Sequence, residues 1–123
     1  FKNINDTHGH LVGDAVLKEV AQRLNNSLRP YDLCGRYGGE EFLIILNSKG
    51  NHVQDLFERI RRAIANTPFF YEDTILNVTI SAGVTLYAPS TDKRNSTQLL
   101  TDADIALYEA KNAGRNRIVF NDD

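Results

Sequence analysis

Two adjacent glycines, Gly38 and Gly39, separate two short apolar stretches and thereby predict a β-hairpin. We expect its strands at Leu33–Tyr37 and Glu41–Leu46. A two-residue hairpin turn needs positive φ angles, which glycine adopts without steric cost, so both glycines are expected to have them.

Helical and strand periodicities alternate along the rest of the chain. Three segments repeat apolar residues every 3.6 positions, and a fourth alternates apolar and polar residues like a half-buried strand. The expected elements are helices at Gly13–Leu28, His52–Asn66 and Ser96–Gly114, and strands at Leu76–Leu86 and Arg117–Phe120. Asp14 is placed to cap the first helix.

The element order is helix, hairpin, helix, strand, helix, strand, which predicts an α+β fold. It resembles a ferredoxin-like, palm-type βαββαβ sheet with helices packed on it, from which the first strand is missing. We expect that strand to precede Phe1. The sequence contains no methionine, so residues 1–123 are interpreted as one partial domain of a longer protein.

Composition narrows the classes of function. The 123 residues are 41% hydrophobic and 24% charged, as in an ordinary globular domain, with a formal net charge of −2. Such a charge gives no long-range attraction, and we expect neither nucleic-acid binding nor membrane contact. A single cysteine, Cys34, and the lack of a long apolar run favour a cytoplasmic setting.

Two carboxylates, Glu40 and Glu41, directly follow the glycine pair. Successive strand residues point to opposite faces, and glycines let a ligand approach the backbone. Carboxylate oxygens suit a magnesium ion, which would neutralise charge on a transferring phosphoryl group. The alternative is solvated turn chemistry, which hairpin statistics alone favour.

Four motifs in this order resemble the GGDEF family, the diguanylate cyclases, with glutamate as the third letter of the signature. They are FKNINDTHGHLVGD at Phe1–Asp14, GGEEF at Gly38–Phe42, NVTISAGV at Asn77–Val84 and ALYEAKNAGRN at Ala106–Asn116. The resemblance implies condensation of two GTP molecules into cyclic di-GMP with loss of pyrophosphate. It also implies Mg²⁺ or Mn²⁺ as the cofactor.

The resemblance assigns roles to single residues. Glu40 matches the family's metal-binding and catalytic carboxylate, and Glu41 matches the acidic position that follows it. The positions that match or adjoin substrate-binding residues are Asn5 and Asp14 for guanine, and Phe1, Lys2, Gly38, Gly39, Lys111 and Arg115 for phosphates. An amide and a carboxylate provide the donor and acceptors that guanine requires.

Each of these assignments has a plainer structural alternative. Asp14 can serve as a helix cap. Lys111 and Arg115 are four residues apart, and we expect them on one side of a helix end, where cations complement the helix dipole.

Arg29 and Asp32, in the segment RPYD, resemble the family's inhibitory product site, and Arg59 matches a secondary arginine there. Arginine suits this task because its planar fork can bind phosphate or a guanine edge with two hydrogen bonds. Alternatively, Arg29 complements the dipole of a helix that Pro30 ends, and Asp32 begins the next segment.

The resemblance also implies that each domain binds one GTP, so that catalysis needs a two-fold homodimer, which can be transient. In the family, an aspartate four residues before Phe1 is a metal ligand, and a helix precedes the first strand. We therefore expect little activity from residues 1–123 alone and a sensor further upstream. The alternative is an inactive domain that binds GTP or cyclic di-GMP as a regulatory module.

Overall fold

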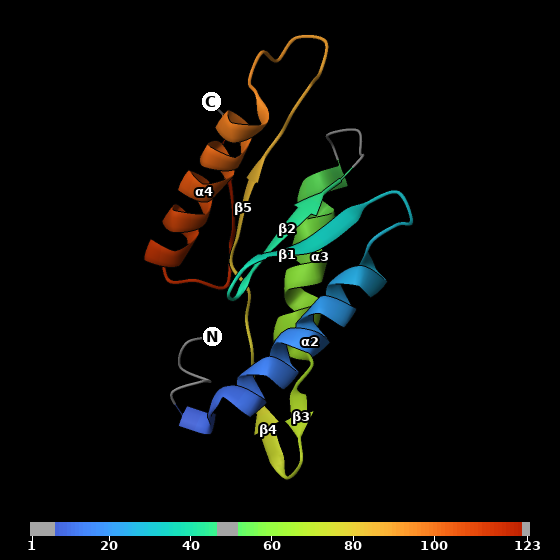
Figure 1. Ribbon diagram of the computed structural model, residues 1–123, viewed down its shortest axis with the longest axis vertical. Coiled ribbons are helices and arrows are strands. Elements are labelled where there is room, and N and C mark those ends of the chain that lie inside the picture. The colour runs from blue at the N-terminus through green and yellow to red at the C-terminus, as the bar shows by residue number, and fades with distance from the viewer. Residues whose placement is uncertain (1–6, 47–51, 122–123) are drawn as a thin grey trace. The chain divides into compact units, whose positions relative to one another are not determined.

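The computed structural model describes residues 7–46 and 52–121. It divides into two compact units, Phe1–Lys49 with Asn66–Val78 and Gly50–Ala65 with Thr79–Asp123, and each is described by itself. The elements are α2 (His10–Ser27), β1 (Leu33–Gly38), β2 (Glu41–Ile45), α3 (Val53–Asn66), β3 (Phe69–Tyr71), β4 (Thr74–Leu76), β5 (Ala82–Thr85), α4 (Ser96–Asn112) and β6 (Ile118–Asn121). All but β6 are labelled in Figure 1.

The first unit combines α2 with two antiparallel hairpins, β1–β2 and β3–β4. One face of α2 is buried through Val16, Leu17, Val20 and Leu24. In the second hairpin, the pair farthest from the turn, Phe69 and Leu76, is also buried. Arg23 of α2 lies over the Phe69 ring at 3.7 Å and donates hydrogen bonds to the carbonyl oxygens of Thr67 and Pro68 at 2.7 and 3.1 Å. These contacts join β3 to α2.

The second unit contains a parallel pair of strands, β5 and β6, against which α4 packs. The packing is close at Gly83, because an added Cβ would lie 2.2 Å from the backbone oxygen of Ala103 and the backbone nitrogen of Leu107. Ala106 and Ala110 of α4 are buried as well. Small residues on both sides therefore let the helix approach the strand backbone.

The loop before α4 has many hydrogen bonds to its surroundings. Arg94 donates to the carboxylates of Asp92 and Asp102 and, at 2.7 Å, to the Thr85 hydroxyl. Asn95 then caps the helix, since its side chain accepts from the Gln98 backbone while the Gln98 side chain accepts from the Asn95 backbone. The expected start of this helix at Ser96 is confirmed.

The α+β class, the three helices, the first hairpin and the C-terminal strand are confirmed to within a few residues. The expected strand Leu76–Leu86 is wrong as one element, because β4 ends at Leu76 and β5 begins at Ala82. The first part pairs with β3 and the second with β6, so the chain changes partners between them. The described strands form three two-stranded sheets.

The expected cap at Asp14 is also wrong. Helix α2 begins at His10, after Gly9, whose φ is 90°, and its N-cap makes no side-chain hydrogen bond. Asp14 therefore lies inside the helix, where it is exposed. Among the described helices, none combines the length and apolar character needed to cross a membrane.

Candidate functional site

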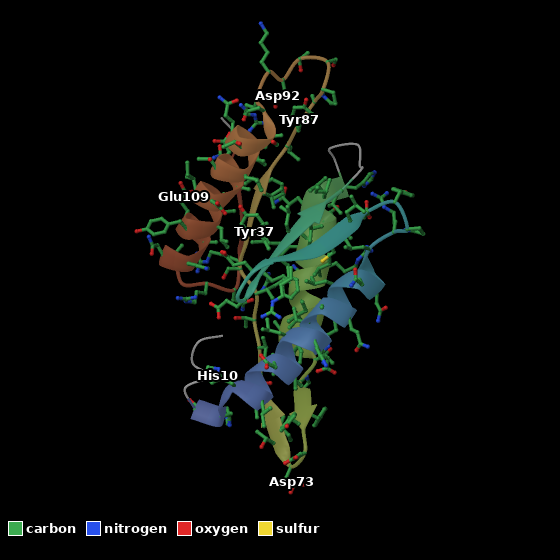
Figure 2. All side chains as sticks on the ribbon, in the orientation of Figure 1. His10, Tyr37, Asp73, Tyr87, Asp92 and Glu109 are labelled. Carbon is green, nitrogen blue, oxygen red and sulfur yellow. The ribbon has the colours of Figure 1, made fainter. Side chains whose placement is uncertain are left out.

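The β1–β2 hairpin carries the acidic residues. Its register runs from Leu33 opposite Ile45 to Gly38 opposite Glu41, with an irregularity between Arg36 and Gly38. Tyr37, labelled in Figure 2, is therefore an extra residue in β1, as in a β-bulge.

The turn itself consists of Gly39 and Glu40, one residue further along than expected. Neither Gly38 nor Gly39 has a positive φ, so that part of the prediction is wrong. The bulge changes the strand register before the turn, which then closes without a left-handed glycine. Arg36 stabilises it by donating from Nε to the Gly39 carbonyl oxygen at 2.9 Å, and its Nη2 also donates to this oxygen.

The space beside the glycines is open. Among the described residues, an added Cβ at Gly39 would meet no atom within 4 Å, and one at Gly38 would meet only Oε1 of Glu41, at 3.9 Å. No contact with residues 7–46 or 52–121 therefore requires glycine at position 39. The missing side chain leaves room in which a ligand could approach the turn backbone.

The two hairpin carboxylates differ in environment. Glu40 is exposed in the turn, whereas Glu41 is half-buried at the start of β2. In the part of the chain that the structure describes, no three His, Cys, Asp or Glu side chains gather as a metal site. Magnesium is usually held by one or two carboxylates together with substrate phosphates, and Glu40 and Glu41 fit this mode.

The predicted guanine-binding and phosphate-binding residues are only partly described. Asp14 lies exposed on α2 in the same unit as the hairpin. Phe1, Lys2 and Asn5 lie outside the described residues.

The predicted cations Lys111 and Arg115 lie at the end of α4. Lys111 is half-buried in the last turn of the helix, which ends at Asn112, and Arg115 is exposed beyond it. The backbone is left-handed at Gly114, Arg115 and Asn116, with φ of 117°, 64° and 49°. The helix ends at Asn112 rather than at the expected Gly114, so the four-residue spacing of a helix does not apply to this pair of cations.

The segment RPYD forms a tight turn in which Arg29 and Asp32 contact each other. Oδ2 of Asp32 accepts from the backbone nitrogen of Arg29 at 2.9 Å and from its Nε at 3.2 Å. The Asp32 side chain is fully buried, whereas that of Arg29 is 43% exposed and lies over the Tyr31 ring at 4.7 Å. The hydrogen bond that Arg29 donates to the Asp32 carboxylate raises the pKa of the Arg29 guanidinium. Arg59 is exposed on α3, in the other unit.

A small pocket lies between α2 and the β1–β2 hairpin, and the sequence did not predict it. Leu17 and Ala21 line it from the helix, and Cys34 and Phe42 line it from the hairpin. Burial raises the pKa of the Cys34 thiol, so this group stays protonated at neutral pH. The residues predicted for the site do not line this pocket.

The hairpin, and its place among the other elements of the chain, agree with a known family. The family profile described as "Diguanylate cyclase, GGDEF domain" matches residues 1–117. The chain belongs to the GGDEF family. Diguanylate cyclase A of Treponema denticola is 43% identical over 121 residues, which cover 98% of this chain and 32% of that protein. The response regulator PleD of Caulobacter vibrioides is 44% identical over 122 residues, which cover 97% and 26%. This GGDEF chain thus spans about a third or less of these curated relatives.

Solved structures confirm the GGDEF fold. The GGDEF domain of YfiN from Pseudomonas aeruginosa gives a TM-score of 0.89 at 32% identity, covering 99% of this chain and 76% of that one. The active GGEEF domain of a diguanylate cyclase from Vibrio cholerae gives 0.83 at 35% identity, with coverage of 99% and 76%. The GGDEF domain of DgcB from Caulobacter crescentus, in complex with cyclic di-GMP, gives 0.86 at 31% identity, with coverage of 99% and 72%.

Proposed function

We propose that this GGDEF chain is the catalytic domain of a diguanylate cyclase that condenses two GTP molecules into cyclic di-GMP. The observation that carries the proposal is the GGEEF turn, in which Glu40 and Glu41 adjoin glycine backbone with open space beside it. The Vibrio cholerae relative, described as active, has a GGEEF domain too. We take residues 1–123 as one partial domain of a longer cytoplasmic protein.

The hairpin would perform the chemistry. In each step the 3′-oxygen of one GTP forms a bond to the α-phosphorus of the other, the bond to the β-phosphate oxygen breaks, and pyrophosphate leaves. The exposed Glu40 carboxylate would take the proton of the attacking hydroxyl, while Gly38 and Gly39 let the phosphates approach the backbone. Mg²⁺ or Mn²⁺, held by Glu40 and phosphate oxygens, would neutralise charge on the transferring group, with Glu41 as the adjoining acidic residue.

The remaining site residues would bind and orient GTP. Asp14 offers carboxylate oxygens that can accept from the N1–H and N2 amine of guanine, together with the amide of Asn5. Phe1 and Lys2 would contact the phosphates, and Lys111 and Arg115 would hold the terminal ones. Their positive charge would offset the negative charge of the triphosphate.

Catalysis would require two copies of the domain. Each copy holds one GTP, and each 3′-hydroxyl must reach the α-phosphate of the other molecule. A two-fold homodimer places two identical half-sites face to face. The dimer needs to exist only while the substrate is bound.

We further propose that the turn of Arg29 and Asp32 binds the product, with Arg59 as a secondary contact. The DgcB relative binds cyclic di-GMP, which supports this second ligand. The buried Asp32 carboxylate orients Arg29, while the half-exposed guanidinium stays accessible to phosphate or a guanine edge. Asp32 would therefore act mainly by holding Arg29 rather than by contacting the base itself.

The test of the catalytic proposal is the substitution Glu40→Gln in the full-length protein. It is expected to abolish cyclic di-GMP formation from GTP and Mg²⁺ without changing thermal stability, because Glu40 is exposed in the turn. The control is Glu72→Gln, which changes an exposed acid in the β3–β4 turn of the same unit and is expected to retain activity. Undiminished turnover by the Glu40 variant would contradict the assigned role.

A further inference from the structure

The turn after α4 has an unusual backbone that must be held in place. Gly114, Arg115 and Asn116 are all left-handed, with φ of 117°, 64° and 49°. Glycine adopts this region freely and asparagine tolerates it, but an arginine there costs free energy. Such residues persist only where the surrounding structure fixes them.

Contacts from two other segments fix the last residue of this turn. Arg61 of α3 donates from Nη1 to Oδ1 of Asn116 at 2.8 Å and to its carbonyl oxygen at 3.5 Å. The backbone nitrogen of Asn116 donates to the hydroxyl of Ser81, just before β5, at 3.2 Å. Arg115 lies between this anchored residue and the helix end, where its nitrogen donates to the Ala110 carbonyl at 3.0 Å.

Arg61 is itself held in a defined orientation. Its Nε donates to Oε1 of Glu58, one turn earlier on α3, and its Nη2 donates to Oε2 at 3.1 Å. This two-point contact leaves Nη1 directed at Asn116, and only 18% of the Arg61 side chain is exposed. The same hydrogen bonding lowers the pKa of the Glu58 carboxylate, which therefore stays ionised at neutral pH.

The neighbouring arginine lacks this arrangement and provides a control. The side chain of Arg62 is 68% exposed, and its Nε reaches Oε2 of Glu58 only at 3.7 Å. Removing Arg62 thus deletes one positive charge of α3 near the same glutamate while the bonds between Arg61 and Asn116 remain.

We propose that Arg61 is a positioning residue for the terminal phosphates of GTP: through Asn116 it fixes the left-handed turn and so directs Arg115. This inference rests on the proposed function, in which Arg115 binds those phosphates. Arg61 acts at a distance and does not touch the nucleotide in this account. It adds a residue outside the four sequence motifs to the binding machinery.

A merely structural role would give a different result from a positioning role. If Arg61 only connected α3 to the turn, its loss would lower the stability of the protein and weaken the binding of all guanine nucleotides alike. If it directs Arg115, its loss weakens the binding of a triphosphate and leaves the binding of a monophosphate unchanged, because only the triphosphate reaches Arg115.

The experiment measures binding by calorimetry in the full-length protein with 3′-deoxy-GTP, which lacks the attacking hydroxyl, and with GMP. Arg61→Ala is expected to weaken the binding of 3′-deoxy-GTP about tenfold. This is the order expected when a hydrogen bond to a charged group, here that of Arg115 to a phosphate, is lost. GMP binding should not change. Arg62→Ala should leave both affinities as they are, and Arg61→Lys should not restore binding because lysine lacks the planar fork.

A second variant leaves Arg61 intact and keeps the test decisive if Arg61→Ala fails to fold. In Asn116→Gly the glycine adopts the left-handed backbone freely, but the Oδ1 acceptor is removed. This variant should show the same selective loss of affinity for 3′-deoxy-GTP. Unchanged 3′-deoxy-GTP affinity in this variant would overturn the inference.

The double variant Arg61→Ala with Arg115→Ala separates this inference from the proposed function. If Arg61 acts through Arg115, the double variant binds 3′-deoxy-GTP no more weakly than Arg115→Ala alone. Additive losses would overturn the positioning role while leaving Arg115 as a phosphate ligand. An Arg115→Ala variant with undiminished affinity would instead contradict the proposed function itself.

Discussion

Replacing Gly39 by alanine should separate the fold of the hairpin from its function. The turn backbone at Gly39 does not need a positive φ, and an added Cβ would meet no atom within 4 Å. The methyl group therefore causes no backbone strain and no clash with the residues that the structure describes. It does occupy the space through which a phosphate group would approach the backbone.

The substitution is expected to change the stability of the protein and its affinity for GTP in opposite directions. Where the native backbone suits alanine, the substitution removes freedom from the unfolded chain and stabilises the protein by about 0.4–1 kcal/mol. Overlap of one methyl group with a bound phosphate resembles overpacking, which costs about 1–3 kcal/mol. GTP affinity should therefore fall about tenfold or more while the melting temperature stays constant or rises slightly.

The assay pairs thermal unfolding with calorimetric binding of 3′-deoxy-GTP to the full-length protein. Gly35→Ala is the control, because an added Cβ on this β1 residue also meets nothing within 4 Å. It should stabilise the protein by a similar amount and leave the affinity unchanged. Unchanged affinity in Gly39→Ala, or a loss of stability that accounts for the weaker binding, would refute the reasoning.

Three further changes test other parts of the structure. Gly83→Ala should lower the free energy of unfolding in a denaturant titration by about 3 kcal/mol, since its Cβ would lie 2.2 Å from backbone atoms of α4. Asp92→Asn should flatten the pH dependence of stability below about pH 4. Hydrogen bonds from Arg94 lower the pKa of Asp92 in the folded protein. The stability that ionised Asp92 contributes is therefore present above the ordinary pKa of an aspartate and is lost as the pH falls through the lowered pKa. Asp14→Ala should weaken GTP binding more than ATP binding in calorimetry, with a stability change within about 0.5 kcal/mol, because this exposed residue does not cap α2.

The elements with long periodic patterns could be predicted from the sequence. Helices α3 and α4 each repeat apolar residues over several turns, and both begin within one residue of the expected position. The short β3–β4 hairpin was missed because each of its strands has only three residues, too few for a pattern. Alternation in 76–86 indicated buried positions such as Leu76 and Val84, but it could not show that the chain changes strand partners between them.

The site could be predicted as a set of residues but only partly as a geometry. The motif around Glu40 identified the hairpin turn, yet the bulge at Tyr37 depends on strand register, which a local pattern does not specify. The contact between Arg61 and Asn116 joins residues 55 positions apart, and no motif connects them. Such contacts depend on how separate elements pack, so they appear only in the folded chain.

The central claim, that this chain joins two GTP molecules, is tested most directly by the stoichiometry of the reaction. Full-length protein is incubated with GTP and Mg²⁺, and nucleotides and pyrophosphate are quantified by chromatography and mass spectrometry. The account predicts one pyrophosphate for each GTP consumed and one cyclic di-GMP for every two, with no product when Mg²⁺ is removed by a chelator. GTP that is bound without release of pyrophosphate, or converted to GDP and phosphate, would contradict it.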